Sequence, residues 1–169
     1  MHISIFNNLF LVLIAVCASA CSHYQLGSPA ELPFKTIYVA PANNDSFAPQ
    51  AQAILTQQIS AALLREGIRL AGKDTAEATL HIRITQYDKE ISATQREDTA
   101  LAQSFALELQ ANATLINNKT GTPYFKDRAH SSQQQTYVDG GFQPSEYQSM
   151  PVLLERLANN IKNTVISVW

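Results

Sequence analysis

The sequence predicts an α+β fold, a two-layer sandwich in which two helices pack on one face of a roughly four-stranded sheet in the order β-α-β-β-β-α. Two observations lead to this prediction. Two segments repeat apolar residues at helical spacing, and two others alternate apolar and polar residues as half-buried strands do. A helix or sheet with one apolar face must bury that face against another element, so we expect these segments to pack together.

The first strand and the first helix are predicted between Lys35 and Gly67. Residues 35–39 (KTIYV) are a short β-rich run, and residues 43–46 read as a turn or helix cap. Pro49 suits the first turn of a helix, and Gly67 is a typical residue just past a helix end. Between them, the apolar residues at helical spacing are Ile54, Leu55, Ile59, Ala62 and Leu63.

Three further strands are predicted between residues 80 and 137. Residues 80–85 alternate apolar and polar side chains, and residues 105–115 continue the same pattern over a longer run. The segment 117–121 (NNKTG) is a strong turn signal, so a hairpin is expected with residues 124–137 as its return strand.

The second helix is predicted from Pro151 almost to Trp169, after a loop that Gly140 and Gly141 open. Its apolar residues lie on one helical face: Leu153, Leu154, Leu157, Ile161, Val165 and Val168.

The N-terminus resembles a bacterial lipoprotein signal. Residues 1–20 carry no Asp, Glu, Lys or Arg, and the apolar run that ends them is too short to span a bilayer. It ends in Ala-Ser-Ala before Cys21, as in a lipobox, so we expect cleavage before Cys21 and acyl chains on that residue. The alternative is an ordinary signal peptide followed by an incidental cysteine. We therefore predict a signal peptide (1–20), a lipidated tether (21–33) and one domain (34–169).

The predicted anchor has consequences for location. Each buried methylene contributes roughly 0.8 kcal/mol, so several acyl chains hold a protein firmly on a membrane. Ser22 follows the cysteine, and in the bacterial sorting pattern this favours the outer membrane. Cys17 would leave with the signal, so the mature chain could form no internal disulfide.

Composition and motifs argue against several function classes. The net charge of −2 does not suggest a nucleic-acid-binding protein. No cofactor motif, catalytic constellation or zinc motif occurs, since His23, His81 and His130 have no ligand-like neighbours at suitable spacing. We therefore expect neither an enzyme nor a cofactor. The acidic residues at 88, 90, 97 and 98 are expected in a solvated loop.

Cationic side chains suggest one weak candidate site. Lys126, Arg128 and His130 alternate along the predicted return strand, and Arg83 lies with His81 on the polar side of another strand. If these faces coincide, the stripe could contact phosphate groups of an anionic lipid. The alternative, which we favour, is an ordinary solvated sheet face with cross-strand partners such as Glu108.

Nearly the whole mature chain, from Cys21 to Trp169, resembles a divergent branch of the LPS-assembly lipoprotein family, LptE. The resemblance rests on the lipobox and on three segments: Leu32–Gly67, Asp98–Leu109 and Ser145–Ile161. It implies a non-enzymatic lipoprotein in the outer membrane, facing the periplasm or the lumen of a large β-barrel. Such a protein assists assembly of the barrel, plugs it, and binds the lipopolysaccharide that the barrel exports.

Two other functions are open. One is a periplasm-facing lipoprotein that binds and regulates a cell-wall enzyme or another envelope complex, and the other is a hydrolase, which the missing constellation disfavours. The uncharged polar run 131–136 (SSQQQT) suits the wet, polar lumen of a barrel. It is also compatible with an ordinary polar strand end.

Overall fold

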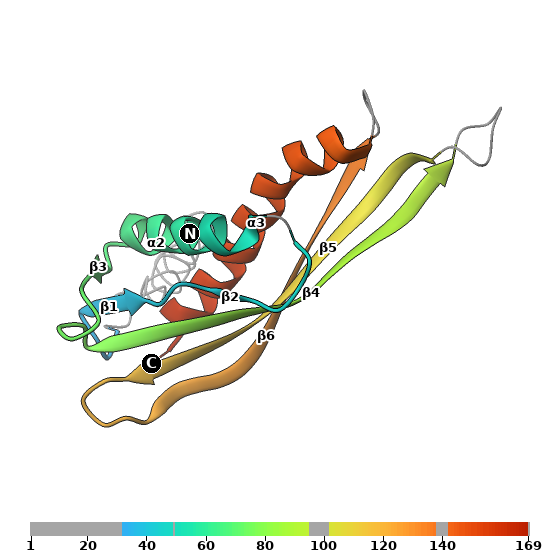
Figure 1. Cartoon of the computed structure of the whole chain (residues 1–169). Coiled ribbons are helices and arrows are strands. Elements are labelled where there is room, and N and C mark those ends of the chain that lie inside the picture. Colours follow the sequence, from blue (N-terminus) through green and yellow to red (C-terminus); the bar gives the residue numbers. More distant parts are fainter. Residues whose placement is uncertain (1–31, 49, 95–101, 138–141, 169) are drawn as a thin grey trace, which may run out of the picture. The chain divides into compact units, whose positions relative to one another are not determined.

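Both helices lie on one face of a mixed sheet in the computed structural model (Figure 1). The structure describes residues 32–48, 50–94, 102–137 and 142–168. In chain order, its elements are β1 (Thr36–Val39), β2 (Asn43–Asn44), α2 (Ala51–Arg65), β3 (Arg69–Leu70), β4 (Ala78–Thr94), β5 (Ala102–Asn117), β6 (Pro123–Tyr137) and α3 (Phe142–Ile166).

The sheet has six strands in the order β3-β1-β4-β5-β6, with β2 paired to β4 beyond the end of β1. The pairs β1–β3, β1–β4 and β2–β4 are parallel, and the long strands β4, β5 and β6 are antiparallel neighbours. The predicted α+β class and the placement of both helices on one face are confirmed. The strand count is six instead of about four, because the two-residue strands β2 and β3 are too short to show a sequence period.

The alternating segments form strands because every second residue enters the core. On β5, residues 107, 109, 111, 113 and 115 are fully buried, and the alternate residues between them are only partly covered. The helices contribute their apolar faces to the same core: Leu55, Ile59 and Leu63 from α2, and Leu153, Leu154, Leu157, Ile161 and Val165 from α3.

Helix α2 ends as the sequence predicts. Gly67 has a φ of 80°, a left-handed conformation that glycine adopts without strain. Its N–H donates to the Leu64 carbonyl and the N–H of Ile68 donates to the Leu63 carbonyl, so the last turn of the helix is capped by backbone groups.

Two predicted boundaries are wrong. Helix α3 begins at Phe142, so Pro151 lies inside it instead of at its start. A proline inside a helix removes a hydrogen bond, but contacts with the sheet hold the preceding turns. Strand β4 continues to Thr94, which places Asp88 and Glu90 on a strand and not in a loop. The other two acidic residues of that predicted loop, at 97 and 98, lie outside the described residues.

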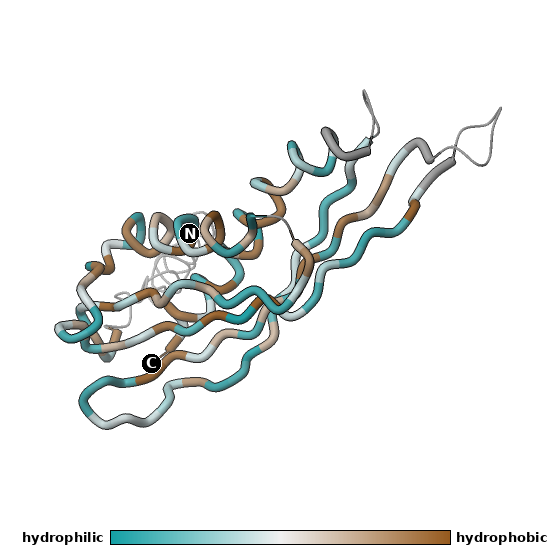
Figure 2. Tube along the Cα trace, viewed as in Figure 1, coloured by the Kyte–Doolittle hydropathy of each residue, from teal (hydrophilic) through white to brown (hydrophobic). Residues whose placement is uncertain are grey.

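A register shift between Ile84 and Gln86 divides the three long strands into two halves. The proximal half comprises residues 78–84, 111–117 and 123–130, and the distal half comprises residues 86–94, 102–110 and 131–137. Helix α2 lies over the proximal side, whereas α3 continues along the distal half (Figure 1). Figure 2 shows hydrophobic residues concentrated in α2 and the strands beneath it, and mainly hydrophilic residues along the distal parts of β4 and β6.

Candidate functional site

The sheet face that carries no helix, here called the open face, is lined by polar side chains of β4, β5 and β6. Directly opposed residues in antiparallel strands point to the same face, so the register defines rows across the sheet. Three rows are Arg83–Asn112–Ala129, Gln86–Gln110–Ser131 and Asp88–Glu108–Gln133. Amides and hydroxyls dominate these rows, which makes the open face a broad hydrogen-bonding surface.

Two carboxylates face each other on the distal part of the open face. Asp88 is opposed by Glu108, and each accepts a hydrogen bond from a neighbouring amide. The Nε2 of Gln86 lies 2.6 Å from Asp88 Oδ2, and the Nε2 of Gln110 lies 3.0 Å from Glu108 Oε1. These donors offset the like-charge repulsion, and the pair makes this part of the open face acidic.

Arg83 lies on the proximal part of the open face. Its Nε is 3.7 Å from Asp45 Oδ2, and both side chains are more than half exposed. An exposed pair of this kind contributes little stability. Arg83 also lines a hollow of about 470 Å³ together with His81, Asn112 and Asp127. The guanidinium therefore remains accessible to a ligand from solvent.

A β-bulge at Asp127 separates the cations that the sequence placed on one side of β6. Phe125 is paired with Leu115 and Arg128 with Ala113, so Lys126 and Asp127 together oppose Thr114. Asp127 has a φ of 45°, and its N–H donates to Thr114 Oγ1 over 3.0 Å. The extra residue interrupts the simple alternation on which the predicted stripe depended.

The bulge therefore leaves Lys126 and Arg128 on opposite faces. The register places Lys126 on the open face with Arg83. Arg128 lies on the helix-bearing face, where its guanidinium carbon is 5.8 Å from the centroid of the Phe125 ring. The structure thus brings Arg83 and Lys126 to one face, and does not bring Arg128 to it.

His130 also lies on the helix-bearing face, opposite Ala111. Its side chain is half-buried, and its Nε2 has no hydrogen-bond partner among the described residues. Burial, assisted by the nearby positive charge of Arg128, lowers the pKa of His130 below its ordinary value of 6.5. His130 is therefore neutral near pH 7 and adds no charge to a cationic surface.

The sequence analysis missed a buried polar cluster in the distal half. Glu146 of α3 accepts a hydrogen bond from Tyr87 Oη at 2.6 Å and pairs with Lys89 Nζ at 2.7 Å. The ammonium of Lys89 also lies 5.3 Å from the centroid of the Tyr87 ring. Burial and then the hydrogen bond to Glu146 raise the pKa of Tyr87, so its hydroxyl stays a proton donor. The sequence pattern predicted the strand only as far as residue 85 and the helix only from Pro151, so no spacing could reveal the contact.

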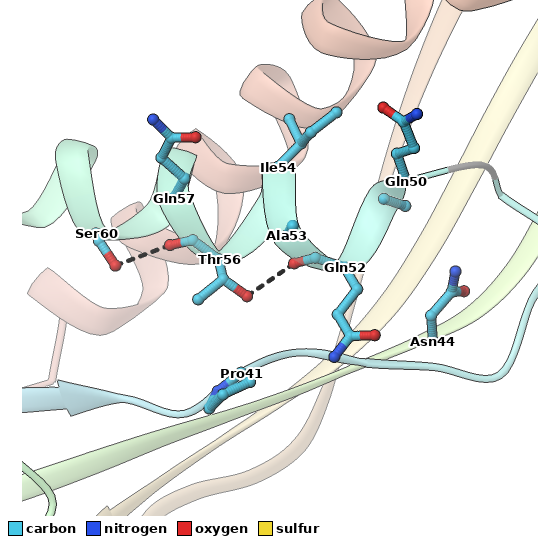
Figure 3. A pocket seen from close by; sticks show the side chains of 10 residues that line it. Pro41, Asn44, Gln50, Gln52, Ala53, Ile54, Thr56, Gln57 and Ser60 are labelled. Atoms are coloured by element: carbon cyan, nitrogen blue, oxygen red, sulfur yellow. Dashed lines mark hydrogen bonds between the residues drawn. The ribbon is translucent and has the colours of Figure 1, made fainter.

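A groove of about 710 Å³ runs between α2 and the segment that joins β1 to β2. Figure 3 shows Gln52 reaching from α2 toward Pro41 and Asn44 across it. Its floor is held by Thr56, whose Oγ1 accepts the N–H of Ala42 at 3.0 Å and donates to the Gln52 carbonyl at 2.8 Å. The described residues that line the groove are all uncharged and present amides, hydroxyls and apolar groups. Among them, no acid, base or nucleophile pair occurs.

The outer edge of β6 is covered by side chains of α3. Arg156 Nη1 donates to the Gln133 carbonyl and Asn160 Nδ2 donates to the Ser131 carbonyl, both at 2.9 Å. In the other direction, Ser132 Oγ donates to the Leu153 carbonyl at 3.0 Å. The bonds from Arg156 and Asn160 occupy backbone carbonyls that an edge strand otherwise offers to another chain.

The remaining predictions concern the lipid-attachment residue, metal binding and membrane-spanning helices. Cys21 lies outside the described residues. Within the described ranges, no group of three or more His, Cys, Asp or Glu side chains is placed to hold a metal ion. Neither α2 nor α3 combines the length and apolar character that crossing a bilayer requires.

Known proteins resemble this chain at two levels. The profile of the LptE family, described as lipopolysaccharide-assembly, matches residues 34–165. Solved structures with a similar fold include a minor lipoprotein from Acinetobacter baumannii, with a TM-score of 0.55 and 14% identity over 80% of this chain and 95% of that one. An uncharacterized lipoprotein B from Nitrosomonas europaea has a TM-score of 0.52 and 13% identity over 86% of this chain and 88% of that one.

A hypothetical protein from Chlamydia trachomatis has a TM-score of 0.57 and 9% identity over 80% of this chain and 97% of that one. At such identities these likenesses establish the fold alone. No curated protein matches the sequence. The family profile, in contrast, covers all six strands and nearly all of both helices. The chain therefore belongs to the LptE family of lipopolysaccharide-assembly proteins.

Proposed function

We propose that this protein is an outer-membrane lipoprotein that assists assembly of a lipopolysaccharide-exporting β-barrel and plugs its lumen. The observation that carries the proposal is the family match over residues 34–165. The protein acts by binding and not by catalysis. Its partners are the barrel, the lipopolysaccharide that the barrel exports, and the membrane that holds its acyl chains.

The open face supports a position inside a barrel. The lumen of a large outer-membrane barrel is polar and hydrated, and a surface of amides and hydroxyls can exchange hydrogen bonds with it. Gln133 and Gln135 are exposed on the distal part of β6, and the register places both on the open face with Glu108 and Ala106. We propose that this part of the face contacts the barrel wall.

The anchor is proposed to be the acylated Cys21. Intact-mass measurement of the membrane-extracted protein should show acyl chains on the N-terminal cysteine. A Cys21→Ala variant should remain unprocessed or leave the membrane fraction. A mature protein without acyl mass, or normal processing and membrane retention of the variant, would contradict the anchor and leave the barrel partnership as a separate question.

The partnership is tested by photocrosslinking in intact cells. A crosslinker at Gln133 or Gln135 should capture the barrel, and one at the buried Leu153 should not, because that side chain is enclosed by the protein's own core. Depletion of the protein should also reduce correctly assembled barrel and make the outer membrane leaky to large hydrophobic compounds. Unchanged barrel assembly and surface lipopolysaccharide after depletion would refute the proposal, and copurification with a murein synthase would favour a regulatory lipoprotein.

The lipid contact is proposed to involve cations, with Arg83 and Lys126 on the open face and Arg128 on the other. Guanidinium and ammonium groups suit the phosphates of an anionic glycolipid. All three side chains are exposed, so their charges should act additively and should weaken with salt.

A further inference from the structure

The first two turns of α3 are attached to the sheet differently from the rest of the helix. We refer to Phe142–Met150 as the flap and to Leu153–Ile166 as the stem. In the stem, Leu153, Leu154 and Leu157 are fully buried apolar anchors. The stem is therefore attached to the sheet by apolar contacts.

Polar contacts predominate between the flap and the distal half of the sheet. The Glu146 carboxylate accepts a hydrogen bond from Tyr87 Oη at 2.6 Å and forms a salt bridge with Lys89 Nζ at 2.7 Å. Thr136 of β6 donates to the Ser145 carbonyl at 3.2 Å and accepts from Ser149 Oγ at 2.8 Å. Among the flap side chains that the structure describes, Met150 is the one buried apolar residue.

Pro151 lies at the junction of flap and stem. It has no N–H to donate to the carbonyl four residues earlier, that of Tyr147, so the helix lacks one of its own bonds at this point. Prolines are the commonest sites of helix kinks. The junction is therefore the place where α3 bends at the lowest cost.

A hydrogen bond between neutral groups, exchanged for bonds to water on opening, contributes less net free energy than a buried leucine. Segments with few buried apolar contacts open locally at lower free energy than the core does. We propose that the flap opens about Pro151 while the stem stays docked, and that Glu146 is the latch that holds it closed. This inference does not depend on the proposed function. Opening releases Lys89 from its carboxylate and uncovers the distal sheet face at Leu107.

Hydrogen–deuterium exchange of the full-length, detergent-extracted protein tests the hinge. Amides of residues 146–150 should exchange at least about tenfold faster than those of residues 157–161, since local opening exposes the first group only. Pro151→Ala restores the missing donor and should slow exchange in residues 146–150 about tenfold. Equal protection of the two segments in the unaltered protein would overturn the proposal.

The latch is tested by Glu146→Gln, which keeps an acceptor for Tyr87 but loses the charge that pairs with Lys89. Exchange of residues 146–150 should rise about tenfold and exchange of residues 157–161 should not change. Glu155→Gln, at an exposed position on the same helix, is the matched control and should alter neither segment. If Glu146→Gln does not fold, Tyr87→Phe removes only the hydroxyl and should give the same pattern. Faster exchange in both segments alike would mean global destabilisation and would refute the latch.

Discussion

The proximal and distal halves of the long strands are built on the same alternating pattern but are stabilised by different interactions. The proximal half lies under two helices and buries large apolar side chains such as Leu80, Ile84 and Leu115. In the described residues, the distal half and the flap that covers it contain most of the buried polar side chains: Ser104, Ser132, Thr136, Ser145 and Glu146. Stability is therefore expected to reside in the proximal half, and the distal half is expected to adapt more easily to a partner.

The largest expected effect is a truncation in the apolar core, in the stem of α3. Leu157→Ala should lower the free energy of unfolding by about 2–5 kcal/mol, since it removes a fully buried side chain and leaves a cavity. The measurement is chemical denaturation of the protein produced without residues 1–21. Leu64→Ala, on the exposed side of α2, is the control and should change the free energy by less than about 0.5 kcal/mol. Equal effects of the two would mean that Leu157 does not belong to the apolar core.

A change that removes only polar contacts of the distal half should cost less. Thr136→Val keeps the shape of the side chain but removes its hydrogen bonds with Ser145 and Ser149. The expected loss is about 1 kcal/mol, a typical net value for such bonds. The same denaturation measurement applies. A loss as large as that of Leu157→Ala would show that the distal half is as important for stability as the proximal half.

The boundary between the halves should respond to pH through His130. Its folded-state pKa is lowered below 6.5, so the folded protein binds this proton less readily than the unfolded chain does. The stabilisation is present above pH 6.5 and is lost as pH falls through the lower folded pKa. Denaturation midpoints of the unaltered protein should thus fall more steeply on acidification than those of His130→Asn. Parallel pH profiles would contradict the role of His130.

The smallest effects on stability are expected from the exposed cations. Lys126→Ala and Arg128→Ala should each change unfolding by less than about 0.5 kcal/mol. Each should weaken lipopolysaccharide binding at low salt, and the loss should shrink near physiological ionic strength, where exposed charges are screened over about 8 Å. Because the two side chains lie on opposite faces, an effect of one variant only would identify the face that meets the lipid. Unchanged binding in both would leave them as ordinary solvated charges.

Features that repeat over many residues were predictable from the sequence. The alternation in β5 and the leucines of α3 each give several concordant positions, so a single exception does not alter the assignment. Features set by one residue were not. The extra residue at Asp127 moves every later side chain of β6 to the other face, and a period of two contains no signal for it.

The distal contacts were missed because they join segments far apart in the chain. Nothing near Tyr87 indicates that it meets Glu146, and the proline at 151 argued for a helix start instead of a helix interior. Within the described part of the chain, the groove beside α2 has no sequence signature either, because its lining comes from the segment before α2 and from one side of the helix. Single-sequence patterns therefore predict the layers well and predict the cross-layer contacts poorly.

The bonds from Arg156 and Asn160 to the edge of β6 affect how copies of this protein can associate with one another. An exposed row of strand carbonyls is a template on which a second copy can align, and the product of repeated alignment is an insoluble fibre. With two of these carbonyls already occupied from within the same chain, stacking along this edge is obstructed. Copies of the protein at high local concentration can thus remain separate from one another.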